Sequence, residues 1–326
     1  MPLRHKGPRI PSTILEKIKP RVQLVEYIKD SPRIVASAGK QTISPKPFNE
    51  ILGKMDSVKT QKWIKELLRR GHGSPLEHSI YIFHVTCSRV ASHQLVRHRI
   101  ASYTQLSQRY SDKYLVRLVE SIRRLLGAGQ GREPPGSHKY MAYSETIKQY
   151  ISTNPSYIEL LEVVSEAFIV PPSILVSGGK EYLVGLLNSV AIYYELLSHG
   201  ISYEDARFIL PQSVKTQILV SMNARELVEN FLPLRMCSHA QWEIRYIAWS
   251  LWRSLATVHP QLFMYTGPRC VLYENRIRDE PCSLPSFIDG KCGFTITRCP
   301  ELVPRDGIRN CLLNASRDPW SIVGGD

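Results

Sequence analysis

The 326-residue sequence has no apolar run close to the roughly 20 residues that a membrane-spanning helix needs. Its basic N-terminal segment, Met1 to Arg9, is not followed by the apolar stretch of a signal peptide. We therefore expect a cytoplasmic protein without a membrane partner. None of its seven cysteines stands in the CxxC spacing of a zinc finger, which removes the most specific sign of a metal site.

The cysteines are unevenly distributed along the chain. Cys87 and Cys237 stand alone, whereas the other five lie in the C-terminal part: Cys270, Cys282, Cys292, Cys299 and Cys311. The spacing leaves three interpretations open, namely a disulfide, a loosely spaced zinc site and unpaired structural thiols.

Apolar and charged residues are both plentiful. Hydrophobic residues make up 43% of the chain and charged residues 22%, which supports a sizeable core and excludes a disordered chain. The net charge of +13, from 42 Lys and Arg against 29 Asp and Glu, favours anionic partners. Such partners include nucleic acid, acidic membranes and phosphorylated small molecules, although a merely solvated basic surface would give the same count.

The hydrophobic pattern predicts the elements of the first half. These are a strand at 22–28, a small-residue loop at 31–42, a helix at 60–70, a strand at 79–87, a helix at 88–99 and a loop at 100–112. The strand at 79–87 is rich in β-branched and aromatic residues, so we expect it to be buried on both faces. Ser88 is the expected N-cap of the helix that follows.

The second half reads as helical. Its expected elements are a flexible linker at 127–137, helices at 182–198 and 202–210, a helix through 214–222 that leads toward 223–235, and a long helix at 239–259. Ser202 and Ser238 are the expected N-caps, and Gly200 and Pro211 are the expected stops. A core stripe on the last helix is formed by Trp242, Ile247, Leu251 and Leu255.

The densest polar cluster spans residues 94–110. If its first part is helical, Gln94, Arg97 and His98 share one face, since they stand at i, i+3 and i+4. Hydroxyl, amide and guanidinium groups follow at once: Ser102, Gln105, Ser107 and Arg109. Because arginine binds phosphate in a planar, bidentate manner, this set suits a phosphorylated nucleotide. A surface patch that binds RNA, or a solvated basic turn, is the alternative.

Two further clusters contain polar residues of interest. In 223–243, Arg225, Asn230, Arg235 and His239 stand among apolar residues, and burying so many donors requires an anionic ligand or salt bridges. In 72–78, the spacing from Ser74 to Glu77 fits a helix capping box. The histidines of that segment match no familiar metal motif, so we expect no metal there.

Five segments together point to a family. The stretch RHRIASYTQLSQRY at 97–110 resembles the signature of flavin-dependent thymidylate synthases. The resemblance continues in HGSPLEHSIYIFHV, ARFILP, MNARELVENFLPLR and SHAQWEI, and it covers roughly 21–114 and 182–265. It implies an α+β fold, with helices packed on a mixed β-sheet, and a homotetramer whose flavin sites are built from several subunits.

The same resemblance suggests a domain organisation. We expect an N-terminal tail at 1–20, a synthase domain at 21–265 and a Cys-rich extension at 266–326. The region at about 115–180 is longer than in compact members of the family. The segment NARELVENFLPLR is one residue longer than its counterpart in those members.

The family's reaction methylates dUMP to dTMP with carbon from 5,10-methylenetetrahydrofolate and a flavin hydride that NADPH or NADH supplies. The resemblance implies FAD contacts at His72, Ser74, Glu77, Arg97, His98, Arg99, Gln105, Asn223, Arg225, Asn230, Leu234 and His239. It implies dUMP contacts at Gln94, Arg97, Gln105, Ser107, Gln108, Arg109, Arg207 and Arg235. Arg235 matches the arginine that favours ionisation of the uracil ring, a role that suits a guanidinium beside a developing anion.

Other mechanisms and functions compete with this interpretation. Ser107 has no base beside it in sequence, so we expect it to bind phosphate rather than to act as a nucleophile. Cys87 and Cys237 are expected to be core thiols. The rival function is a nucleic-acid-binding module that uses 97–99 as its basic footprint. A metal-stabilised interaction module would rest on the C-terminal cysteines alone.

Overall fold

A four-stranded antiparallel sheet forms the centre of the computed structural model, which describes residues 9–127 and 136–323. The strands lie in the order β1 (Arg21–Tyr27), β2 (Ile80–Ser88), β4 (Lys215–Asn223) and β3 (Ala101–Gln105). The fold class is α+β as expected. The prediction of a mixed sheet is wrong, because all three strand pairings are antiparallel.

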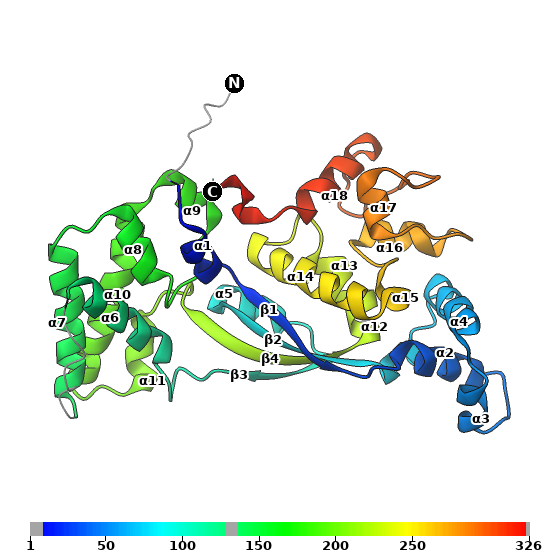
Figure 1. The fold of residues 1–326 in the computed structure, drawn as a ribbon, viewed down its shortest axis with the longest axis horizontal. Coiled ribbons are helices and arrows are strands. Elements are labelled where there is room, and N and C mark those ends of the chain that lie inside the picture. The colour runs from blue at the N-terminus through cyan, green and yellow to red at the C-terminus, as the bar shows by residue number, and fades with distance from the viewer. Residues whose placement is uncertain (1–8, 128–135, 324–326) are drawn as a thin grey trace.

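One face of the sheet is buried and the other is open. On β2, Tyr81, Phe83 and Val85 point into the core, while Ile80 is 43% exposed on the opposite face. In the part of the chain that the structure describes, no helix covers that outer face (Figure 1). The expectation that 79–87 is buried on both faces is therefore wrong, since the strand alternates as in a sheet covered on one side.

Helices of the second half cover the inner face of the sheet (Figure 1). They include α13 (Leu232–Arg235), α14 (Trp242–Val258) and α15 (Pro260–Phe263). The predicted stripe of α14 is buried at Ile247, Leu251 and Leu255. Its N-cap is Gln241 rather than Ser238, because the Gln241 side chain accepts hydrogen bonds from the Glu243 and Ile244 amides.

Three segments differ from their predicted structure. The expected loop at 31–42 is α2 (Ser31–Gln41), whose Gly39 packs so closely on α4 (Ser57–Arg70) that a Cβ would lie 3.0 Å from Leu67. The expected helix at 214–222 is β4, and the expected loop at 100–112 contains β3. In both cases pairing with neighbouring strands outweighs local propensity. The helix at 60–70 is confirmed and begins three residues earlier.

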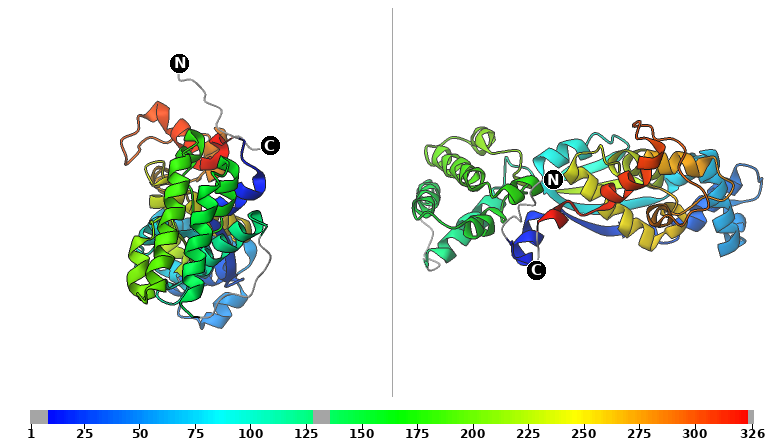
Figure 2. Two further views of the ribbon diagram at one scale, coloured as in Figure 1. Left: turned by 90° about the vertical axis from the view of Figure 1, so that its left-hand side faces the viewer. Right: turned by 90° about the horizontal axis from the view of Figure 1, so that it is seen from above.

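A helical lobe lies at one end of the sheet, and α2, α3 (Phe48–Gly53) and α4 lie at the other (Figures 1 and 2). The lobe contains α6 (Lys113–Leu125), α7 (His138–Ser152), α8 (Tyr157–Val164), α9 (Pro172–Ser177), α10 (Lys180–Ser198) and α11 (Tyr203–Ala206), followed by η2 (Arg207–Ile209). The helix at 182–198 and the Ser202 cap are confirmed. The described parts of the region 115–180 are thus mainly helical, and residues 128–135 of the expected linker lie outside the described residues.

The N-terminal segment joins this lobe. Residues Ser12–Ile18 form α1, and Ile14, Leu15 and Ile18 are buried in the same apolar cluster as α10. The segment expected to be a tail therefore packs into the fold from Ile10 onward.

A buried lysine links the lobe to the sheet. Lys215 of β4 donates through Nζ to the backbone carbonyls of Ser165 and Lys17. Its pKa is lowered to about 7, chiefly by burial and to a smaller extent by nearby Lys and Arg side chains, while Glu166 opposes the decrease.

This shift predicts how stability depends on pH. Between pH 7 and the ordinary lysine range near 10.5, the unfolded chain holds a proton on Lys215 that the folded chain has lost. In that window the unfolding free energy therefore increases with pH. Below pH 7 the folded chain carries the full free-energy cost of burying a charged lysine. We expect the stability of the wild type relative to Lys215→Met to rise between pH 7 and 10 in urea titrations. A difference that does not change with pH would contradict this assignment.

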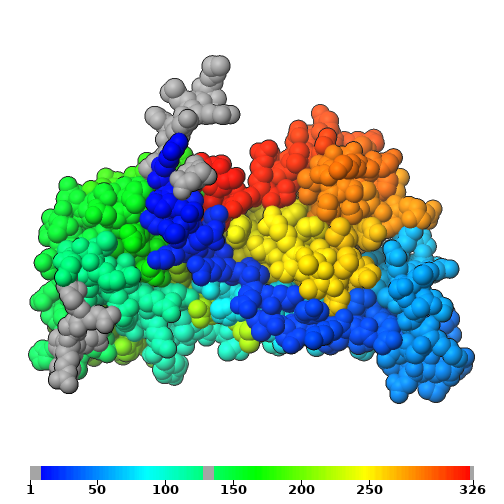
Figure 3. Space-filling view, viewed as in Figure 1, coloured from blue at the N-terminus to red at the C-terminus, as the bar shows by residue number. Residues whose placement is uncertain are grey.

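The C-terminal extension packs on α13–α15 (Figures 1 and 3). It contains α16 (Arg269–Arg276), α17 (Leu284–Asp289), η4 (Arg305–Gly307), α18 (Ile308–Ser316) and η5 (Pro319–Ile322). Cys282 and Cys292 form a disulfide, which selects one of the three open interpretations for these two residues. No helix within the described residues is long and apolar enough to cross a membrane.

Candidate active site

The site is built around the helical turn that follows β4. Asn223 caps α12 (Ala224–Glu226) by accepting a hydrogen bond of 2.8 Å from the Glu226 amide. The chain then forms a π-helix, η3 (Leu227–Phe231), before α13. A π-turn contains one more residue than an α-turn, so it would accommodate the extra residue that the sequence comparison leads us to expect here.

Two side-chain pairs at i, i+4 point to different sides of this turn. Glu226 accepts from the Asn230 amide at 2.9 Å, and Arg225 donates to Glu229 at 3.0 Å. One short helical segment therefore contributes to two neighbouring polar networks.

The first of these, here called the His98 network, joins residues far apart in the sequence. His98 is 5% exposed, and its Nδ1 lies 2.9 Å from Oε1 of Glu226, which is 3% exposed. Arg235 donates through Nε to His98 Nε2 at 3.0 Å and through Nη2 to the Gln94 carbonyl at 3.2 Å. Phe231 packs edge-on against the imidazole.

The contacts of this network define its protonation pattern. Since His98 Nε2 accepts from Arg235, the imidazole proton lies on Nδ1 and is donated to Glu226. Arg235 forms no ion pair with a carboxylate within the described residues, and burial lowers its pKa. A half-buried guanidinium without an acidic partner can bind a negative charge that develops beside it.

The second, here called the Arg225 network, lies on the other side of the turn. Arg225 donates through Nη1 to Glu77 at 2.5 Å, and Arg276 of the extension donates to Glu229 at 2.9 Å. A Cβ at Gly73 would lie 2.5 Å from Arg225 Nε, so a larger residue there would displace the Arg225 side chain. The predicted capping box from Ser74 is absent. Its segment forms a short 3₁₀ helix, η1 (Ser74–His78), and Glu77 binds Arg225 instead.

A pocket of about 720 Å³ opens between α2, α4 and η1. His72 and Ser74 line it, beside the aromatic ring of Trp63. Basic side chains of α4 also line this pocket, namely Lys59, Lys62 and Arg70. Such a combination of cations and an aromatic surface suits an anionic ligand with a planar ring system.

A third group, here called the Glu204 group, lies where the sheet meets the helical lobe. Arg109 pairs with the Glu204 carboxylate at 3.2 Å, and Arg207 donates to the Glu204 carbonyl at 3.0 Å. Ser107 lies in the same loop and accepts from the Arg109 amide. Arg89, half-buried nearby, has its pKa lowered by burial and by the like charge of Arg207. The group therefore concentrates positive charge.

The structure brings together only part of the predicted site within one chain. Helix α5 (Arg89–Leu95), capped by Ser88 as predicted, ends before the RHR triplet, so the expectation that Gln94, Arg97 and His98 share one helical face is wrong. Arg97 and Arg99 are exposed and make no hydrogen bond or ion pair within the described ranges.

The remaining predicted residues have structural contacts of their own. Gln105 donates to the hydroxyls of Ser92 and Thr216, and Gln108 lies beside Lys215 at the base of the lobe. Leu234 lines a small cavity with three cysteine side chains, and the exposed His239 lies 3.9 Å from Glu301.

The free cysteines lie outside these networks. Burial raises the pKa of the Cys87 and Cys237 thiols, which suits core thiols rather than nucleophiles. Among the described residues, no group of three or more His, Cys, Asp or Glu side chains is arranged to hold a metal ion.

Three residues of these networks were missed by the sequence analysis. Glu226 was detectable as a carboxylate in an apolar segment, four residues before Asn230. Glu229 was detectable in the same way, as a carboxylate four residues after Arg225. No sequence pattern pointed to Arg276, because only the tertiary fold brings α16 beside Glu229.

Comparison with known proteins identifies the class to which this fold and site belong. The family model described as thymidylate synthase complementing protein matches residues 23–261. A crystal structure of flavin-dependent thymidylate synthase from Helicobacter pylori, complexed with FAD and dUMP, is similar with a TM-score of 0.51 at 24% identity. The match covers 76% of this chain and 99% of that chain, and it supports the fold.

Two relatives have higher sequence identity. The flavin-dependent thymidylate synthase of Aeropyrum pernix is 49% identical over 304 residues, which cover 90% of this chain and 93% of the relative. That of Saccharolobus solfataricus is 39% identical over 301 residues, which cover 90% and 96%. The chain belongs to the flavin-dependent thymidylate synthase family.

Proposed function

We propose that this protein methylates dUMP to dTMP, with FAD as cofactor, 5,10-methylenetetrahydrofolate as carbon donor and NADPH or NADH as reductant. The observation that carries the proposal is the His98 network. It buries a carboxylate and an imidazole in order to fix one guanidinium, that of Arg235, which has no acidic partner within the described residues. Such pre-organisation is expected where negative charge develops on a substrate.

The residues present fit a flavin. The 720 Å³ pocket offers His72 and Ser74 beside Trp63 and three basic side chains, and Arg225 lies close to Gly73 at the adjoining turn. FAD has an aromatic ring system and an anionic diphosphate, so both kinds of group have matching surfaces here. Bound flavin would supply the hydride chemistry that none of these side chains can perform.

The remaining residues would bind two different parts of the nucleotide, the phosphate and the uracil ring. Ser107, Arg109 and Arg207 of the Glu204 group would hold the phosphate of dUMP, because guanidinium and hydroxyl donors match phosphate oxygens. Arg235 would stabilise negative charge on the uracil ring and so make the ring carbon more nucleophilic. The Gln94 carbonyl accepts from Arg235, and Gln105 donates to the hydroxyl of Ser92 on α5.

A homotetramer would complete the site. Arg97 and Arg99 are exposed, and the open face of the sheet presents Ile80 and Leu219 to solvent. Exposed apolar residues, together with arginines that have no partner among the described residues, are typical of an interface that buries them. Light scattering should give the mass of four chains of 37.2 kDa, about 149 kDa, and a monomer would contradict this assembly.

An absorption spectrum of the purified full chain tests the proposed function most cheaply. A yellow protein, with flavin bands that bleach on reduction and with dUMP-dependent turnover, is the expected result. A colourless protein that takes up no FAD, and whose affinity for RNA falls steeply with salt, would favour the nucleic-acid-binding alternative instead.

A further inference from the structure

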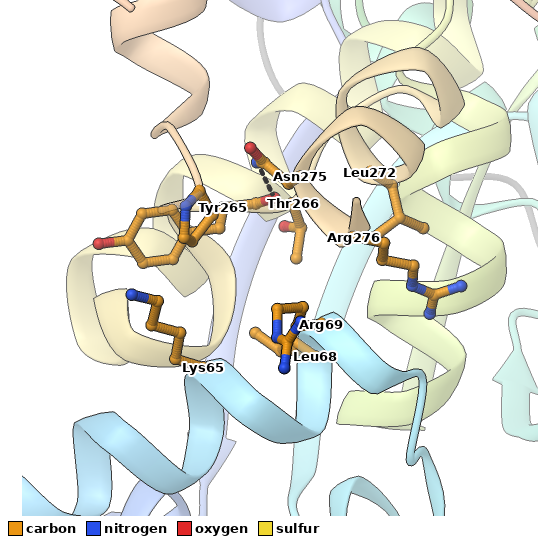
Figure 4. Close-up of a pocket in the computed structure, with 9 residues that line it drawn as sticks. Lys65, Leu68, Arg69, Tyr265, Thr266, Leu272, Asn275 and Arg276 are labelled. Carbon is orange, nitrogen blue, oxygen red and sulfur yellow. Dashed lines mark hydrogen bonds between the residues drawn. The ribbon is translucent and has the colours of Figure 1, made fainter. Parts of the chain in front are cut away.

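Arg276 is supplied to the Arg225 network by a part of the chain that the family model does not cover. The family match ends at residue 261, whereas Arg276 is the last residue of α16 in the extension. Figure 4 shows α16 and the segment before it facing α4, with Arg276 directed away from Lys65 and Arg69. Its guanidinium Nη2 lies 2.9 Å from Glu229 Oε1.

The contact continues a chain of alternating charges. Glu229 is largely buried and uses its other oxygen, Oε2, to accept from Arg225 Nε at 3.0 Å. Arg225 in turn donates to Glu77 Oε1 at 2.5 Å. Two guanidiniums and two carboxylates sum to zero net charge, so removal of Arg276 would leave the network with a formal charge of −1.

We propose that Arg276 is a positioning residue of the flavin site, which neutralises Glu229 so that Arg225 can bind the anionic part of the cofactor. The proposal rests on the proposed function, in which Arg225 contacts FAD. Without Arg276, two carboxylates compete with the cofactor diphosphate for one guanidinium. The like charge of Glu229 then repels the diphosphate in a partly desolvated setting.

The extension holds Arg276 in place through the residue before it. Asn275 donates to the carbonyls of Tyr265 and Cys282 and accepts from the Cys282 amide. Cys282 is bonded to Cys292, so one amide side chain connects α16 to the disulfide-closed loop. A cavity of only about 20 Å³ remains between this region and α4, which indicates close packing behind the guanidinium (Figure 4).

The test compares FAD affinity among full-length variants. Arg276→Ala should raise the dissociation constant of FAD about tenfold. Arg276→Lys should raise it less, since lysine keeps the positive charge but lacks the planar guanidinium geometry. The double variant Arg276→Ala/Glu229→Gln should return close to wild-type affinity, because it removes the unpaired carboxylate. Arg305→Ala, an exposed arginine of the same extension that donates to Thr295, is the matched control and should bind FAD as the wild type does.

The outcomes separate this inference from the proposed function. If the wild type binds FAD and Arg276→Ala binds it equally well, or if the double variant is as weak as the single one, the inference is wrong while the flavin enzyme stands. If the wild type binds no FAD, the proposed function itself fails. If Arg276→Ala does not fold, Glu229→Gln alone decides, because neutralisation predicts affinity at least as tight as the wild type and weaker binding contradicts it.

Discussion

Arg235→Ala is expected to lower the turnover of dUMP by up to about a thousandfold, while FAD remains bound. Removing one pre-organised donor from a developing anion typically costs 10²–10³ in rate. Arg235 is also held by His98 and by the Gln94 carbonyl, so its position is fixed before substrate arrives. Single-turnover measurements with reduced enzyme would separate this loss from any change in nucleotide binding.

Two cysteine variants are the controls for this experiment. Cys87→Ala and Cys237→Ala should keep turnover, because burial holds both thiols in their protonated form. If either variant lost turnover while flavin remained bound, a cysteine nucleophile would replace the flavin-centred mechanism.

Glu226→Ala is expected to have the second largest effect. The carboxylate is almost completely buried and accepts from His98 and from Asn230, while the Glu226 backbone amide donates to the Asn223 cap. Its removal leaves the buried imidazole donor without a partner, which costs about 1–3 kcal/mol of stability. Turnover should also fall about a hundredfold, because a small displacement of Arg235 is enough for such a loss.

Glu195→Ala is a suitable control for Glu226→Ala. Glu195 forms an exposed pair with Lys148 in the helical lobe, so its variant should keep both the melting temperature and the turnover of the wild type. Thermal unfolding and steady-state rates measured on the same samples decide the matter. A Glu226→Ala variant that matched the control in both would contradict the supporting role assigned to the buried carboxylate.

The sequence predicted elements well where the local signal was strong. The helix at 60–70 ends before Gly71 as local chemistry predicted, whereas its observed cap, Asp56, lies earlier than the predicted start. The helix at 182–198 is long and strongly apolar, and it was predicted within two residues. The prediction of a helix at 214–222, which rested on local propensity, was wrong. These residues alternate between buried and partly buried positions of a central strand, which is stabilised by pairing with β2.

The residues of the candidate site were likewise predicted only where the local sequence carried a clear pattern. Five segments of the sequence indicated the family and named Arg225, Asn230 and Arg235, all of which lie in or beside the two networks. The sequence did not reveal which charges balance them. Glu229 and Arg276 are 47 residues apart and meet only after the extension has packed on α4. Nor does one chain place Arg97 against a ligand, since its side chain faces outward.

The central claim is that distant arginines of this chain hold one nucleotide against one flavin. A crystal structure of the full-length protein with FAD and dUMP tests it most directly. We expect Arg235 within hydrogen-bonding distance of the uracil ring, and Arg109 and Arg207 on the phosphate. A structure with both ligands bound in which Arg235 still contacts only His98 and Gln94, far from the nucleotide, would contradict the account.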